Sequence, residues 1–386
     1  MRKPTYRFFD EQEYAGRLAS LRQRMRDAGI DALLVNTPEN IFYLCGYQSP
    51  GYYFYMGLVV PADRDPVLIP PPHEESLVAA FAWIDEYRIY PDTTVGIDAT
   101  RDLLLELGLG GATVGLEERS WFLTGSDRAR LVEGLPDARF ADGSGLVEEG
   151  RLIKSTAELE YVRRAAGAAS DGMRAGLNAA RDGATELEVA AEIHRGQLLS
   201  GSEYTGLPTF VTSGERTMLV HATWSSRELT DGDPVFLEVP GCINRYHVAM
   251  TRTAYVGEPT DEYEAAVEVA NRALEKAKES IGPGVPASET FEVGRAAIDD
   301  AGVGYRQARR LAYGIGIAFP PGWDEGHLMS INRNEQRPFR PGMTFHLITT
   351  MRIPGLGAIG CSDTVLVTED GCETLTAAVG HGIHRA

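Results

Sequence analysis

The chain has few cysteines, no long apolar run and an excess of acidic over basic residues. Its four cysteines (Cys45, Cys242, Cys361 and Cys372) share no spacing typical of a metal or redox site, so we expect buried free thiols in a reducing cytoplasm. No stretch approaches the ~20 consecutive apolar residues that span a bilayer, and the first residues lack the apolar core of a signal peptide. The net charge of −18 argues against nucleic acid, whose phosphates need clustered Lys and Arg. These absences predict a cytoplasmic protein that binds neither a membrane nor a nucleic acid.

The remaining composition is that of a folded protein with more than one domain. Hydrophobic residues make up 43% of the 386 positions, which is enough for substantial cores. Over residues 1–152 a helical pattern alternates with short apolar strands, which predicts an α/β domain whose sheet is covered on both faces. Residues 153–386 open with a helix N-cap pattern, Ser155-Thr-Ala-Glu158, and continue with helices expected at about 156–180, 186–199 and 260–280. Strands punctuated by Gly and Pro lie between these helices, which predicts an α+β domain.

The second domain carries a series of short motifs in a characteristic order. They are His221, Gly232-Asp-Pro-Val-Phe-Leu-Glu238, Thr251-Arg-Thr253, Tyr313-Gly-Ile-Gly316, Gly342-Met343 and Asp363-Thr-Val365. This layout resembles the pita-bread family, which contains methionine aminopeptidase, aminopeptidase P, prolidase and creatinase. The segment from Arg151 to Glu160 resembles the linker into the catalytic domain of aminopeptidase P and creatinase. The resemblance covers nearly the whole chain and implies a creatinase-like N-terminal domain followed by a pita-bread catalytic domain.

The metal-ligand positions of this family are mostly replaced here. The peptidases hold two metal ions with two Asp, one His and two Glu, and the matching positions read Glu238, Ala249, Tyr313, Ile348 and Ser362. A divalent cation needs several anionic oxygens or imidazoles that converge on one point, and one carboxylate cannot supply them. We therefore expect the pocket to remain while the metals are lost, with no other cofactor in their place.

Strand periodicity nominates further residues for the same face of the sheet. Side chains two apart on a strand point the same way, so even offsets from the ligand positions are informative. Around Ala249 and Ile348 this rule selects His247, His346 and Arg352 as substrate-binding candidates. Arg352 is the candidate for clamping a substrate carboxylate. A surface arginine is the competing interpretation for that position.

Three residues are the candidates for catalysis. Glu238 lies in the apolar run Val-Phe-Leu-Glu-Val, where a carboxylate is costly unless it has a function or a partner. It is a candidate nucleophile, general base or anionic partner for a cationic substrate. His221 matches a histidine of the peptidases and creatinase and is a candidate for proton transfer. Tyr313 is a candidate hydrogen-bond donor to a developing charge. The structural alternatives are a buried ion pair for Glu238 and a hydrogen-bonded core histidine for His221.

Aromatic residues gather in a loop of the first domain and beside His221. The loop holds Tyr52, Tyr53 and Phe54, and Trp224 follows His221 by three residues. Aromatic faces suit a delocalised cation such as an amidinium, although an aromatic loop often only packs. The resemblance implies a homodimer in which the N-terminal domain of one subunit closes the partner's pocket. We therefore assign Tyr52, Tyr53 and Phe54 to substrate binding, together with Trp224 beside His221.

Two further segments narrow the resemblance within the family. Tyr313-Gly-Ile-Gly-Ile-Ala-Phe-Pro-Pro321 and Gly342-Met-Thr-Phe-His-Leu347 look like the ectoine hydrolase group. This implies metal-independent hydrolysis of a C–N bond in a small zwitterionic amidine or guanidine, with ring opening of ectoine to an N-acetyl-diaminobutyrate as the best match. A creatinase-type amidinohydrolase, a metal-dependent Xaa-Pro peptidase and a non-catalytic binding protein of the same fold remain the alternatives.

Overall fold

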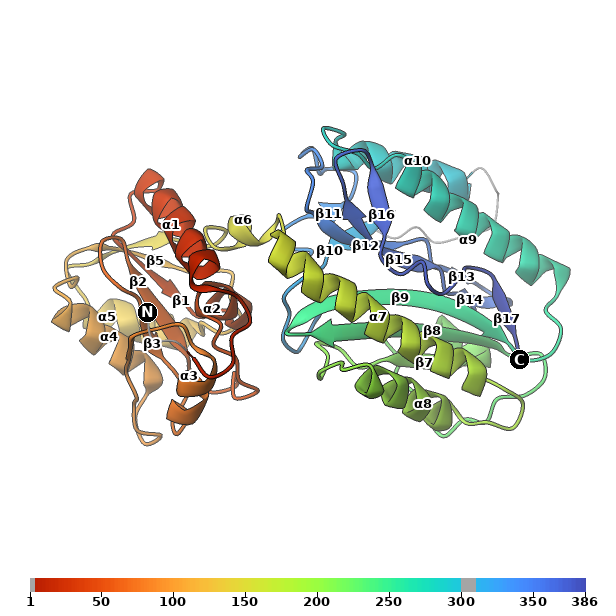
Figure 1. The fold of residues 1–386 in the computed structure, drawn as a ribbon, viewed down its shortest axis with the longest axis horizontal. Helices are drawn as coiled ribbons and strands as arrows, with labels where there is room; N and C mark the ends of the chain where they lie inside the picture. The colour runs from red at the N-terminus through yellow and green to blue at the C-terminus, as the bar shows by residue number, and fades with distance from the viewer. Residues whose placement is uncertain (1–3, 300–309) are drawn as a thin grey trace. The chain divides into compact units, whose positions relative to one another are not determined.

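A computed structural model describes residues 4–299 and 310–386, which divide into two compact units (Figure 1). The units are Met1–Arg151 and Leu152–Ala386, so the division lies one residue before the expected boundary after position 152. Each unit has its own sheet and its own buried apolar core. In the described ranges, no helix is both long enough and apolar enough to cross a bilayer.

The N-terminal unit is a six-stranded sheet with helices between its strands. Its helices are α1 (Glu11–Asp27), α2 (Pro38–Cys45), α3 (Glu75–Phe81), α4 (Gly96–Glu106), α5 (Gly125–Gly134) and α6 (Glu148–Arg151). The strands are β1 (Ala32–Val35), β2 (Gly57–Pro61), β3 (Val67–Ile69), β4 (Glu86–Tyr87), β5 (Thr113–Leu116) and β6 (Arg139–Asp142), in the order β4-β3-β2-β1-β5-β6. All four residues of β1 are buried because helices cover both faces of the sheet. The predicted α/β domain is confirmed, and β2 pairs with β3 in an antiparallel arrangement.

The C-terminal unit is built on one large, mostly antiparallel sheet. Its helices are α7 (Thr156–Ala179), α8 (Glu186–Leu199), α9 (Asp261–Glu279) and α10 (Ala287–Asp299), with the short 3₁₀ helix η1 (Gly214–Met218). The main strands are β7 (Phe210–Ser213), β8 (Pro234–Ile243), β9 (Tyr246–Tyr255), β10 (Ala312–Gly314), β11 (Ser330–Ile331), β12 (Thr344–Ile348) and β15 (Ser362–Val367). The short strands β13 (Met351–Ile353), β14 (Gly357–Ile359), β16 (Cys372–Thr374) and β17 (Ile383–Arg385) complete the unit. The seven main strands are ordered β11-β10-β12-β15-β9-β8-β7, which is the predicted α+β catalytic domain.

Local sequence explains where the long helices begin. Ser155 caps α7, and Glu158 returns the hydrogen bond in the reciprocal arrangement that the sequence predicts. Thr185 and Glu188 do the same for α8, and Thr260 caps α9 through the backbone N–H of Tyr263. The predicted helices at 156–180, 186–199 and 260–280 therefore agree with the structure.

The helices of the C-terminal unit lie on one face of its sheet. In Figure 1, α7 runs along β8 and β9. A Cβ on Gly241 would lie 2.1 Å from the carbonyl oxygen of Ala165 in α7, so residues 237, 239 and 241 of β8 face this helix. Because alternate residues of a strand point to opposite faces, Glu238 faces away from α7. Cys361, just before β15, contacts Asn271 of α9, and Asp363 of β15 contacts Lys278 of the same helix. Ser362, which lies between them, therefore faces away from the helices.

Strand pairing then brings the five family ligand positions together on that second face. Glu238 lies opposite Thr251, and Ala249 lies opposite Pro240, one pleat along. Ser362 lies opposite Thr251 on one side and Ile348 on the other. Tyr313 lies opposite His346. The positions Glu238, Ala249, Tyr313, Ile348 and Ser362 therefore come from five strands, β8, β9, β10, β12 and β15.

The close approach of α7 to β8 predicts a large difference between two glycine substitutions. Gly241→Ala places its Cβ against the α7 backbone, which cannot move aside cheaply, and we expect a loss of roughly 1–3 kcal/mol in the free energy of unfolding. Gly167→Ala is the matched control, because nothing lies within 4 Å of a Cβ there and alanine favours the helix. We expect Gly167→Ala to be neutral or stabilising in urea denaturation. Equal effects of the two substitutions would contradict the packing described here.

Candidate active site

Glu238 is the central residue of the site. It is the one residue of β8 that keeps partial solvent exposure, while the nine others are buried. Across residues 4–299 and 310–386, its carboxylate has no hydrogen-bond or ion-pair partner. Burial raises its pKa to about 7, against the opposing effect of the positive charge of Arg352. A carboxylate in this state is a good candidate for a functional group, because its ionisation is held near neutral pH and its oxygens are unoccupied.

Apolar side chains surround the carboxylate. Phe210 of β7 lies directly opposite Glu238 in the sheet, and Phe236 precedes it by two residues on the same strand face. The buried cluster around them consists of Phe210, Phe236, Ala249, Tyr313, Ile315, Ala318, Trp323 and Ala358, with Leu207 and Ile348 packed against it. Three of the five family ligand positions, Ala249, Tyr313 and Ile348, thus belong to an apolar cluster.

A chain of hydrogen bonds runs across β10, β12, β15 and β9 beside this cluster. Trp323 Nε1 donates to the Tyr313 hydroxyl at 2.8 Å, and the same hydroxyl lies 2.7 Å from His346 Nδ1. His346 Nε2 lies 2.6 Å from Ser362 Oγ, which accepts a hydrogen bond from the Thr251 backbone N–H at 2.7 Å. Burial lowers the pKa of His346 to about 3, so its imidazole is neutral. Burial, and then the charge of Glu238, raise the pKa of Tyr313 well above its ordinary value, so its phenol is also neutral.

The groups at this site do not fit a pair of metal ions. The five family positions offer one carboxylate, one neutral phenol and one hydroxyl, and the hydroxyl of Ser362 already bonds His346 and Thr251. The nearest imidazole, His346, has both nitrogens engaged by Tyr313 and Ser362. Two divalent cations need more anionic oxygens or imidazoles than these residues supply.

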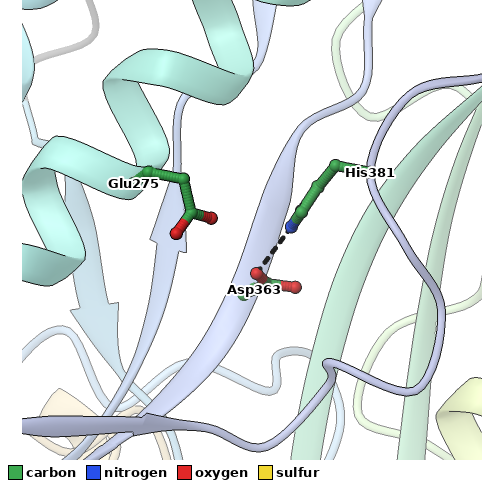
Figure 2. Close-up of side chains that lie close together, drawn as sticks. All are labelled: Glu275, Asp363 and His381. Atoms are coloured by element: carbon green, nitrogen blue, oxygen red, sulfur yellow. Dashed lines mark hydrogen bonds and ion pairs between the residues drawn. The ribbon is translucent and has the colours of Figure 1, made fainter.

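One other group of possible metal ligands occurs among the described residues, on the helix side of the sheet. Figure 2 shows Glu275, Asp363 and His381, whose ligand atoms lie within 4.8 Å of one another. The Asp363 carboxylate already accepts from Arg252 at 2.9 Å, Lys278 at 2.6 Å and His381 at 2.7 Å. Burial alone would raise the pKa of Asp363, but the His381 hydrogen bond and the charges of Arg252 and Lys278 outweigh it and hold the pKa far below its usual range. Protein cations therefore occupy the place of a metal here.

Two predicted residues lie near Glu238. The ring of His221 lies 5.8 Å from that of Phe210, the strand partner of Glu238, and His221 itself is exposed. Its backbone has a φ of 60°, in the left-handed region that is uncommon for residues other than glycine. The Arg352 guanidinium lies 5.2 Å from the centre of the Phe236 ring, and its Nε donates to the Thr217 carbonyl at 3.3 Å.

The structure gives His247 a different role from the predicted one. Its Nε2 accepts from the Gly206 N–H at 3.0 Å, and its Nδ1 lies 2.9 Å from the Arg245 carbonyl, to which it must donate. Both nitrogens are thus occupied by backbone groups, and burial lowers the pKa of His247 to about 3. His247 fastens the segment before β7 to β9 and has no nitrogen left for a substrate hydrogen bond.

The predicted aromatic residues are spread over both units. Trp224 packs edge-on against His194 of α8 at 5.3 Å between ring centres. In the N-terminal unit, Tyr52 contacts Phe122 at 6.1 Å, and the rings of Tyr53 and Phe54 lie 4.7 Å apart. Tyr53 is 79% exposed and Phe54 is 47% exposed, which is unusual for large aromatic side chains.

Sequence reasoning missed Trp323 and Phe210, which complete the site. Trp323 lies in the loop between β10 and β11, where no periodicity indicates the direction of a side chain. Phe210 belongs to a four-residue strand whose pairing with β8 is not visible in the sequence. A tryptophan two residues after Pro320-Pro321 is the sequence signal that could have drawn attention to this loop.

Comparison with known proteins agrees with this architecture. Residues 160–369 match metallopeptidase family M24, and residues 17–153 match the creatinase/prolidase N-terminal domain. The ectoine hydrolase of Halomonas elongata is 30% identical, with 95% of this chain and 96% of that protein covered. The Xaa-Pro dipeptidase of Pyrococcus furiosus is 27% identical, with 93% of this chain and 97% of that protein covered. A solved Xaa-Pro dipeptidase from Bacillus anthracis has a TM-score of 0.84 at 25% identity and covers 97% of this chain and 100% of its own. The resemblance inferred from the motifs is confirmed, and the chain is a hydrolase of metallopeptidase family M24 with a creatinase/prolidase N-terminal domain.

Proposed function

We propose that this protein is a metal-independent hydrolase that cleaves a C–N bond of a small zwitterionic amidine or guanidine. Ring opening of ectoine to an N-acetyl-diaminobutyrate is the reaction that the proposal favours. The observation that carries it is the carboxylate of Glu238, which has no hydrogen-bond or ion-pair partner among the described residues and lies where the family peptidases gather five metal ligands. The identity of 30% with an ectoine hydrolase over nearly the whole chain supports the choice of substrate.

The charge state of the site suits a cationic substrate. A protonated amidine carries a delocalised positive charge, which the Glu238 carboxylate attracts in apolar surroundings where the attraction is strong. The approach of that cation favours the ionised carboxylate and so lowers the pKa of Glu238 from about 7. The Arg352 guanidinium, 5.2 Å from the centre of the Phe236 ring, is the group that we assign to the substrate carboxylate, since a guanidinium matches a carboxylate geometrically.

The chemistry follows from the electrophilic carbon of the amidine. Because the protonated amidine carbon already carries positive charge, it accepts an oxygen nucleophile without help from a metal ion. Glu238 either attacks this carbon itself or removes a proton from the water that does. The C–N bond to one nitrogen then breaks, and that nitrogen takes up a proton. If Glu238 is the nucleophile, water then attacks the carbon and breaks its C–O bond to Glu238, which releases the product and restores the carboxylate. His221, near Phe210, is the exposed imidazole that we assign to this proton transfer.

The first test of this function is a substrate screen combined with metal removal. We expect turnover of ectoine, hydroxyectoine or a related amidine that is unchanged by EDTA or phenanthroline and is not raised by Mn²⁺ or Co²⁺. Product identification by mass spectrometry and elemental analysis of the purified protein complete the measurement. Two metals per chain, together with chelator-sensitive cleavage of Xaa-Pro dipeptides, would favour a peptidase and contradict the proposal. Cleavage of creatine alone would instead favour a creatinase-type reaction.

The second test is Glu238→Gln, which keeps the shape of the side chain and removes its charge. We expect kcat to fall by a factor of roughly 10² or more and the affinity for a cationic substrate to weaken. In the unmodified enzyme kcat/KM should rise with pH through about 7, because the active carboxylate forms as the raised pKa is passed. His221→Ala should slow turnover with a smaller effect on substrate affinity. A Glu238→Gln enzyme that retains turnover within about threefold would show that the carboxylate is structural.

We further propose a homodimer in which the aromatic loop of one subunit closes the site of its partner. The exposed Tyr53 and Phe54 support this proposal, because exposed aromatic pairs are typical of contact surfaces. We expect a dimer at micromolar concentration in analytical ultracentrifugation. Phe54→Ser should weaken the dimer and reduce activity, while Leu105→Ser, at a similarly exposed apolar position on α4 of the same unit, should change neither. A monomer with full activity would overturn the assignment.

A further inference from the structure

The hydrogen-bond chain through His346 allows more than one arrangement of its protons. Each end of the chain has a donor whose direction is certain, because the Trp323 indole N–H and the Thr251 backbone N–H can only donate. The hydroxyls of Tyr313 and Ser362 each accept one of these bonds and each carry one proton of their own. Between them lies His346, whose neutral ring holds one proton on either of its two nitrogens.

The protons of this chain can be arranged in two ways, one for each neutral tautomer of His346. If Nε2 is protonated, it donates to Ser362 and Nδ1 accepts the Tyr313 proton, which leaves the Ser362 O–H surplus. If Nδ1 is protonated, it donates to Tyr313 and Nε2 accepts the Ser362 proton, which leaves the Tyr313 O–H surplus. In both patterns the two ring nitrogens and the two end donors are all bonded, and the patterns differ in which hydroxyl carries a proton that has no acceptor in the chain.

We propose that His346 relays a proton between the Tyr313 and Ser362 hydroxyls by exchanging its two neutral tautomers during C–N hydrolysis. This inference rests on the proposed function and adds to Glu238 and His221 a second route by which a proton can cross the site. His346 acts through the two hydroxyls and is therefore a positioning residue. The relay never makes an imidazolium, which suits a ring that is fully buried.

The two ends of the relay lie where the reaction needs them. Tyr313 and Ser362 occupy two of the five family ligand positions and lie on the same face of the sheet as Glu238. Glu238 acts electrostatically on Tyr313, and Ser362 and Glu238 share Thr251 as a strand neighbour. Both ends of the relay therefore lie on the sheet face of Glu238, on the strands to one side of β8.

The proton balance of the reaction matches this arrangement. When water adds its oxygen to the amidine carbon it loses one proton, and when the C–N bond breaks the departing nitrogen gains one. A proton that enters at one hydroxyl shifts the His346 tautomer, and a different proton leaves from the other hydroxyl. No net charge is left on the chain, and no external acid or base is consumed. Before the next turnover the reverse shift restores the first tautomer, as a proton from water enters at the second hydroxyl and another leaves to water from the first.

The tautomer of His346 is measurable in the resting enzyme by ¹⁵N NMR of histidine-labelled protein. His247 is the matched internal reference, since it is equally buried and its backbone contacts hold the Nδ1 proton in place. We expect fixed, distinct nitrogen shifts for His247 and intermediate, exchange-averaged shifts for His346 between pH 6 and 9. The His346→Gln spectrum assigns the signals among the eight histidines.

Kinetics test whether the exchange is used. Glutamine keeps one donor and one acceptor for the two hydroxyls, but its amide does not exchange them readily. His346→Gln should therefore lower kcat by a factor of roughly 10² with KM within about threefold, and should remove a multi-proton solvent isotope effect seen in the unmodified enzyme. Tyr313→Phe, which cuts the chain at one end, should give the same loss of that isotope effect.

The outcomes separate the relay from the proposed function. A single frozen tautomer of His346, like that of His247, overturns the relay whatever the enzyme hydrolyses. A His346→Gln enzyme with an unchanged kcat and isotope effect overturns it as well. A protein that hydrolyses no amidine or guanidine overturns the proposed function, and the nitrogen shifts still decide whether the tautomers exchange.

Discussion

The buried ion pair between Arg252 and Asp363 is the interaction on which the site depends. Arg252 is on β9 and Asp363 on β15, and their side chains meet at 2.9 Å on the helix side of the sheet. The residues before them, Thr251 and Ser362, point to the opposite face and are bonded there at 2.7 Å. One ion pair thus fixes the register of two strands and aims Ser362 at the site. Removing one partner of such a buried pair typically costs about 3–5 kcal/mol, because the other charge is left unpaired.

The same electrostatic reasoning explains why the ligand positions changed together. Carboxylates that surround two metal ions are neutralised by them, and without the metals several such groups would repel one another in a buried place. Here four of the five positions are uncharged, and only Glu238 keeps a carboxylate. Its pKa of about 7 shows that even one charge is hard to maintain in this environment. Under the proposed function, the cation that balances Glu238 arrives with the substrate, whereas in a metal centre the balancing cations stay bound.

Strand periodicity predicted which residues face the site but not what each one contacts. The even-offset rule placed His346 on the face of Glu238, where the structure has it. The same rule selected His247, whose nitrogens are taken by Gly206 and Arg245. His247 differs from His346 because the loop before β7 covers it, and the path of that loop comes from tertiary packing and leaves no periodic signal in the sequence. The two domains and long helices were predictable because capping boxes and apolar patterns are local, whereas Trp323 and Phe210 reach the site through long-range pairing.

A polar chain beside an apolar cluster is costly unless each of its groups is satisfied. The chain from Trp323 to Thr251 meets this condition at every group but one, because one hydroxyl proton, at Tyr313 or at Ser362, has no acceptor within the chain. Glu238 has the complementary property, since its oxygens lack a donor among the described residues. The sheet face thus holds one hydroxyl proton without an acceptor and one carboxylate without a donor, and a bound molecule that lies between them can satisfy both. The substrate that we propose, an amidine undergoing hydrolysis, would offer a cationic donor to Glu238 and an acceptor to the hydroxyls.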